Sequence, residues 1–263
     1  AAPRQHVGGS FWHSFDHQRG YHPDPFYGGM MDVFRQPKYS YRMFMSQRSP
    51  LQSDILAQTG PMVFIAHEMS PFSPKDVTVY SNCDEVRLSV LKGGKQYIYR
   101  KENRLSGMAS PIIIFPDVFH FMDCKKLLRS HRQQEVFMLA EGYIDGKLVA
   151  THRRSPSLRP EKIVLWLDDE GTGLTANGSD LVTVVAGNKD GNIKRLNNYF
   201  VKFAIEGEAR IVGGNDVIAN PRPVVWGTAP ILLCSTTRPG KIKVTASVLE
   251  EGLEVPLSAE LII

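Results

Sequence analysis

The chain has 263 residues, of which 42% are hydrophobic and 22% charged, a composition ordinary for a globular protein and a length that allows two or three modules. Its 31 basic and 27 acidic residues are spread along the chain, whereas a nucleic-acid-binding protein would gather its basic residues on one face or tail. No apolar run is long enough to span a membrane, and the cysteines are widely spaced without a Cys-x-x-Cys pair. We therefore expect no nucleic-acid partner, no membrane span and no disulfide framework.

The first 50 residues differ in character from the rest of the chain. Residues 8–15 predict a short strand, and a loop rich in glycine and proline follows over residues 18–29. A helix is predicted with Pro37 at its first position, running to about Arg48 and ended by Pro50. One strand, one loop and one helix bury too little apolar surface to fold alone, so this segment is expected to be a piece of an α/β unit.

From about residue 61 the hydrophobic periodicity becomes that of β-strands. Apolar and polar residues alternate within residues 86–90, 201–205 and 242–248. Runs of this kind are separated by short turn sequences that predict hairpins, namely Lys92-Gly93-Gly94-Lys95, Asp145-Gly146 and Asp190-Gly191. Short strands at this spacing predict antiparallel β-sandwiches.

Two sandwiches account for the remaining length. Each would have roughly 100 residues, the usual size of an immunoglobulin-like module. The polar, proline-containing stretch from Arg153 to Pro160 is the predicted joint, which gives domains at residues 51–157 and 158–263. Residues 119–134 interrupt the strand rhythm and predict a loop with a helical turn.

Several segments, in order, resemble glycoside hydrolase family 2, the β-galactosidase-like family. Near the start they are Gly9-Ser10-Phe11-Trp12-His13-Ser14-Phe15-Asp16, Arg19-Gly20-Tyr21-His22-Pro23-Asp24, Gly28-Gly29-Met30-Met31-Asp32 and Arg35-Gln36-Pro37-Lys38-Tyr39-Ser40-Tyr41. Further on they are Glu141-Gly142-Tyr143-Ile144-Asp145-Gly146-Lys147 and Leu174-Thr175-Ala176-Asn177-Gly178-Ser179-Asp180-Leu181. The resemblance implies that residues 1–50 end a catalytic (β/α)8 barrel. It implies two immunoglobulin-like sandwiches after it, the second of them invasin-like, so the expected fold is mainly β.

The resemblance also implies a retaining mechanism that uses two glutamates. Such chemistry needs two carboxyl groups about 5 Å apart, one of them with a raised pKa. The first glutamate of the chain is Glu68, inside the first predicted sandwich. We therefore expect both catalytic glutamates to precede Ala1 and this chain to contain no catalytic residue and to be inactive alone.

The part of the substrate site expected in this chain is the end of the last barrel strand and the loop after it. Trp12 is predicted to lie against the apolar face of a sugar ring, since barrel enzymes place their sites at the carboxyl ends of strands; the alternative is a core role. Polar groups of the following loop are predicted to hydrogen-bond the sugar, namely Asp16, His17, Arg19, His22 and Asp24. The alternatives are a solvated loop held by Asx-turns and a metal site at His13, His17 and His22. No metal and no cofactor are expected.

The other two tryptophans belong to the second sandwich. Trp166 is predicted to be core, and Trp226 is predicted to pack at the edge of the core, although it is the better sugar-binding candidate of the two. The preferred function is part of an exo-acting β-galactosidase that removes terminal β-linked sugars, with β-glucuronidase and β-mannosidase as alternatives. A different class, non-catalytic carbohydrate-binding or structural sandwich modules, stays open. A periplasmic or secreted location is expected for a polysaccharide-degrading parent.

Overall fold

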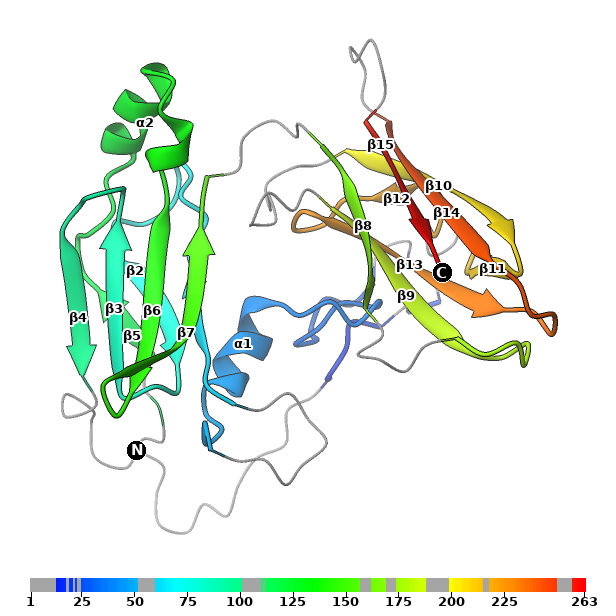
Figure 1. Cartoon of the computed structure of the whole chain (residues 1–263), viewed down its shortest axis with the longest axis horizontal. Helices are drawn as coiled ribbons and strands as arrows, with labels where there is room; N and C mark the ends of the chain where they lie inside the picture. The colour runs from blue at the N-terminus through cyan, green and yellow to red at the C-terminus, as the bar shows by residue number, and fades with distance from the viewer. Residues whose placement is uncertain are drawn as a thin grey trace. The chain divides into compact units, whose positions relative to one another are not determined.

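The computed structural model is mainly β (Figure 1). It describes residues 13–17, 19–20, 22, 25–51, 60–100, 110, 112–156, 162–168, 174–187, 199–214, 218–249 and 257–263. The contacts divide the chain into two compact units. The first contains Ala1–Asp16, Gly28–Asp32 and Pro37–Pro156, and the second contains His17–Tyr27, Val33–Gln36 and Ser157–Ile263.

The first unit contains a sandwich of two antiparallel sheets. The three-stranded sheet has the order β1 (Val63–Ala66), β2 (Val77–Ser81), β5 (Ile113–Phe115). The four-stranded sheet has the order β4 (Gln96–Arg100), β3 (Glu85–Val90), β6 (Met138–Ile144), β7 (Lys147–Arg154). Between β5 and β6 lie helix α2 (Phe121–Arg129) and a 3-10 turn (Gln133–Glu135).

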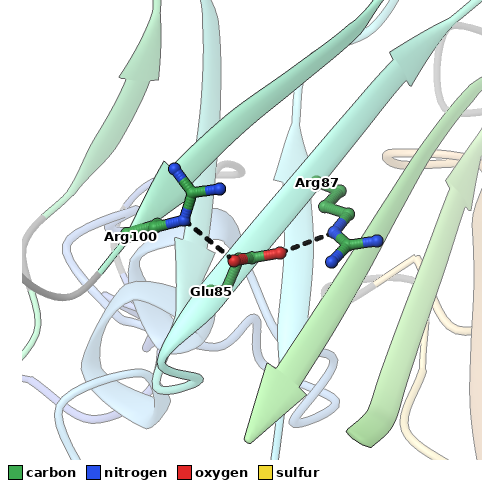
Figure 2. A network of polar contacts seen from close by, with 3 residues as sticks. All are labelled: Glu85, Arg87 and Arg100. Carbon is green, nitrogen blue, oxygen red and sulfur yellow. Dashed lines mark hydrogen bonds and ion pairs between the residues drawn. The ribbon is translucent and has the colours of Figure 1, made fainter. Parts of the chain in front are cut away.

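Strand alternation explains which side chains form the first core. On β3, Val86 and Leu88 are fully buried, while Glu85 and Arg87 point to the opposite face of the sheet. On that outer face Glu85 accepts hydrogen bonds from Arg87 and from Arg100 of the neighbouring strand (Figure 2). The inner residues pack against Ile65, Val77 and Val79 of the other sheet, so that one core is shared by both layers.

The second unit contains a sandwich of two four-stranded antiparallel sheets. One has the order β11 (Ala209–Val212), β13 (Thr228–Ser235), β9 (Leu181–Gly187), β8 (Val164–Asp168). The other has the order β12 (Arg222–Pro223), β10 (Phe200–Gly207), β14 (Ile242–Leu249), β15 (Ser258–Ile262). Its core includes Val184, Ile231, Val201 and Val244, which come from both sheets.

The predicted hairpin turns are confirmed where the structure describes them. Asp145 and Gly146 connect β6 to β7 with φ of 49° and 73°, the left-handed pair that a two-residue hairpin requires. The turn at Lys92–Lys95 connects β3 to β4 as predicted. The predicted turn at Asp190-Gly191 lies outside the described residues.

Three local predictions were wrong in detail. Helix α1 (Tyr39–Met45) is shorter than expected and does not begin at Pro37, because Pro37 forms a bridge with Met31 and Lys38 is still extended, with φ of −85° and ψ of 177°. The interruption after Phe119 holds a nine-residue helix, α2, rather than one turn. Trp166 lies outside the second core cluster, because its strand neighbours Leu165 and Leu167 point into the core and alternation places Trp166 on the other face.

Candidate functional site

Asp16 holds together the segments on which the family resemblance rests. Its side chain is buried, with only 2% of its surface exposed. One carboxylate oxygen accepts hydrogen bonds from the backbone N–H of Gly29 at 2.9 Å and from Lys38 Nζ at 2.6 Å. The backbone N–H of Asp16 donates to the carbonyl of Met31 at 2.9 Å. A buried carboxylate is stable when it is paired and hydrogen-bonded in this way, so these contacts give Asp16 a structural role.

Gly29 has to be glycine because the backbone passes so close to it. A Cβ at this position would lie 2.2 Å from the backbone nitrogen of Asp16 and 2.2 Å from the carbonyl carbon of Phe15, far inside contact distance. Lys38 adds a backbone hydrogen bond to the carbonyl of Met30 at 3.0 Å. Asp16 was predicted from the sequence as a site residue, whereas Gly29 and Lys38 were not predicted as its partners. No local spacing pattern connects position 16 with position 38, so only the resemblance pointed to this group.

Helix α1 packs against the first sandwich around Phe64 of β1. Tyr39 donates a hydrogen bond to Glu68, and its ring meets the Phe64 ring edge-on at 5.5 Å. The guanidinium groups of Arg42 and Arg154 lie 5.7 and 5.6 Å from the centre of the same ring. Phe64 is therefore a point at which helix α1 contacts the first sandwich, through an aromatic contact with Tyr39 and a cation–π contact with Arg42.

The remaining loop residues of the predicted site belong to the second unit. His17 pairs with Phe26 through backbone hydrogen bonds of 3.4 and 2.9 Å, and their rings lie 5.3 Å apart. His22 is exposed and Arg19 is half-buried. Trp12 and Asp24 lie outside the described residues. The role of all six predicted residues in sugar binding stays a prediction.

Residues 33–36 pack on the second sandwich within the second unit. Gln36 donates a hydrogen bond to Asp168 at the end of β8 over 2.7 Å. The guanidinium of Arg222, from β12, lies 4.1 Å from the centre of the Phe34 ring. Within the segment that resembles the end of a barrel, residues 28–32 and 37–45 therefore belong to the first unit, and residues 33–36 belong to the second.

Two glutamates of the first sandwich, Glu85 and Glu135, form ion pairs with arginines. The hydrogen bond from Arg87 lowers the pKa of Glu85, and Arg100 adds to the effect (Figure 2). Arg132 lowers the pKa of Glu135 in the same way. A general acid needs a raised pKa, so neither group suits that role.

The structure was also searched for metal sites and for membrane-spanning helices. Within the residues that the structure describes, no group of three His, Cys, Asp or Glu side chains is arranged to hold a metal ion. None of the described helices is long and apolar enough to cross a membrane.

Trp226 is 55% exposed at a hairpin tip with φ of 52°, so the prediction of packing at the core edge was wrong.

The chain is similar to known glycoside hydrolases in sequence and in fold. No family model matches it. It is 31% identical over 247 residues to a β-galactosidase of Thermoanaerobacter pseudethanolicus, covering 90% of this chain. Among solved structures, a β-glycosidase from Bacteroides vulgatus matches 96% of this chain and 30% of its own, with a TM-score of 0.65 at 22% identity. A glycosyl hydrolase family 2 member from Bacteroides cellulosilyticus matches 96% of this chain and 33% of its own, with a TM-score of 0.59 at 21% identity.

The fold is therefore that of a sandwich-bearing segment of a glycoside hydrolase. The chain is similar in sequence to β-galactosidases and shares its fold with solved members of glycoside hydrolase family 2. It spans 31% of the Thermoanaerobacter relative and 26% of a β-galactosidase of Thermoanaerobacterium thermosulfurigenes, to which it is 29% identical over 73% of this chain.

Proposed function

We propose that this chain is the sandwich-bearing part of a retaining exo-β-glycosidase, a β-galactosidase that removes terminal β-linked sugars from oligo- or polysaccharides. The observation that carries the proposal is the 31% identity with a β-galactosidase across 90% of the chain. In this proposal the two catalytic glutamates lie outside this chain, whose first glutamate, Glu68, already belongs to the first sandwich. The domains would be residues 1–50, 51–157 and 158–263.

In this proposal the leading segment supplies the floor of the sugar site. Trp12 stacks on the sugar ring, and His17, Arg19, His22 and Asp24 supply hydrogen bonds to its hydroxyl groups. Asp16 is in the same predicted set, and its contacts with Gly29 and Lys38 support a role in holding the segment in place. The sandwiches support the barrel that carries the catalytic groups.

The substrate is tested on a longer protein that contains this chain together with its catalytic part. We expect nitrophenyl β-galactoside to be hydrolysed with a higher kcat/KM than the glucoside, mannoside or glucuronide. The panel includes the glucuronide because one structural neighbour, with a TM-score of 0.59, is a β-glucuronidase. A preference for any of the other three sugars would contradict the assignment as a β-galactosidase.

A further inference from the structure

A hollow of about 160 Å³ lies in the first sandwich, between the turn that connects β3 to β4 and the start of helix α2. Its apolar walls are formed by side chains of both elements and by the ring of Tyr97, and its polar groups come from Lys95, His120 and Asp123. At about 30 Å³ per water the volume equals roughly five waters. That is smaller than the pockets of about 300–1,000 Å³ that hold drug-sized ligands, so the hollow suits one small ring.

The turn that forms one wall is held in a constrained conformation. Leu91 has a left-handed φ of 65°, which is uncommon for a bulky side chain. A Cβ at Gly94 would lie 2.0 Å from the carbonyl oxygen of Val90, so only glycine fits there. The turn is tied to the segment after α2, because Leu91 N–H donates to the carbonyl of Phe137 at 2.8 Å and Lys92 N–H donates to that of Glu135 at 2.9 Å. Constrained backbone of this kind is often found at binding sites, so this hollow is a candidate binding site.

The polar groups of the hollow are balanced in charge. Lys95 Nζ lies 5.1 Å from the centre of the Tyr97 ring. Asp123 is half-exposed and forms an ion pair with Lys126 at 3.2 Å, and His120 is half-exposed as well. Among the lining residues, Lys95 and Asp123 supply one charge of each sign and His120 can donate or accept a hydrogen bond, so the lining itself has no excess of either charge.

The buried floor of the hollow is chemically inert. Cys124 is only 1% exposed, and burial, aided by the charge of Asp123, raises the pKa of its thiol to about 11. The thiol therefore stays protonated near neutral pH and is a poor nucleophile. The hollow is suited to non-covalent binding rather than to covalent chemistry.

We propose that this hollow binds a single neutral pyranose residue of a carbohydrate. A pyranose has one apolar C–H face and an edge of hydroxyl groups that both donate and accept hydrogen bonds. The apolar face would lie against Tyr97 and Leu91, and the hydroxyl edge would meet Asp123, His120 and Lys95. The choice of a sugar over other small polar rings rests on the proposed function, whereas the shape and lining of the hollow do not depend on it.

The test is a titration of the 263-residue chain with methyl β-galactoside, followed by amide chemical shifts. We expect saturable shifts at Leu91, Tyr97 and Cys124, with a dissociation constant on the order of 1 mM. The charged probe methyl β-glucuronide is expected to bind more weakly. Absence of saturable shifts, or tighter binding of the glucuronide, would overturn the proposal.

Two variants and a control locate the binding. Tyr97→Ala is expected to abolish the saturable shifts, whereas Ile98→Ala, next along β4 and pointing to the opposite face, leaves them unchanged. Asp123→Asn, on the exposed rim, is expected to weaken binding about tenfold and serves if Tyr97→Ala does not fold. Shifts that persist in both variants would place the sugar elsewhere and overturn the proposal. Because the readout is binding, it is independent of whether the longer protein hydrolyses galactosides.

Discussion

At the scale of single residues, His67 is the clearest case of a side chain held in one protonation state. It is 3% exposed, its Nε2 lies 2.8 Å from the carbonyl oxygen of Pro74, and its Nδ1 accepts the backbone N–H of Met69 at 3.0 Å. A carbonyl only accepts, so Nε2 must carry the proton and Nδ1 must be bare. Burial lowers the pKa of His67, opposed by the hydrogen bond to Pro74.

This arrangement predicts a pH dependence of stability. A histidine whose pKa is lower in the folded than in the unfolded chain binds protons more readily when unfolded, so stability is lost as pH falls. The contribution is complete above the unfolded value of about 6.5 and declines below it until the folded pKa is passed. We expect the urea midpoint of the first sandwich to decrease from pH 7 to pH 5, and to decrease less in His67→Gln. The exposed His131→Gln serves as the control and should keep the wild-type slope. A dependence that is equally steep in His67→Gln would contradict this account.

At the scale of elements, the contact between Asp16 and Lys38 determines how the leading segment is held. Lys38→Met would leave the buried Asp16 carboxylate without its cation, at a cost of about 1–3 kcal/mol. The matched control is Lys75→Met, because Lys75 forms an ion pair of 3.5 Å with Asp117 in which both side chains are well exposed. Exposed pairs of that kind contribute about 0–1 kcal/mol.

Hydrogen exchange at the Gly29 amide measures the effect directly, because this amide donates to Asp16. At about 1.4 kcal/mol for each factor of ten, exchange should become roughly tenfold to a hundredfold faster in Lys38→Met. It should be little changed in Lys75→Met. Equal exchange rates in the two variants would show that the ion pair does not hold the segment.

The elements that could be predicted from the sequence are those with local signals. The alternation of Val86 and Leu88 with charged neighbours, and the Asp145-Gly146 turn, led directly to strands and a hairpin. The sites where prediction failed depend on partners far along the chain. Pro37 lies outside the helix because it forms a bridge with Met31. The position of Trp166 could not be predicted without knowing which face of β8 meets the core.

In the candidate site, too, the contacts between residues far apart in the sequence could not be predicted. Asp16 was chosen as a polar loop residue, but its burial and its contacts with Gly29 and Lys38 come from the crossing of segments 13 and 22 residues away. The contact of α1 with Phe64 could not be predicted from hydrophobic periodicity either, because cation–π and aromatic contacts between distant residues leave no local sequence pattern.

At the level of the whole molecule, the chain has the fold of a sandwich-bearing segment of solved glycoside hydrolases, and in the proposed function its catalytic glutamates lie outside this chain. The residues before Glu68 contain no glutamate. The glutamates Glu85 and Glu135 are held ionised by arginines. Double displacement at a glycosidic bond needs two carboxyl groups about 5 Å apart, one of them with a raised pKa, and under the proposed function we expect this chain alone to be inactive.

The most direct measurement is therefore an activity assay of the purified 263-residue chain. It is incubated with nitrophenyl β-galactoside, β-glucoside, β-mannoside and β-glucuronide, and the release of nitrophenol is compared with that of a buffer blank. We expect no turnover above the blank for any of the four substrates. Turnover that persists at constant specific activity through a second, different purification would show that the chain carries its own catalytic groups, and the proposal that they lie outside it would be wrong.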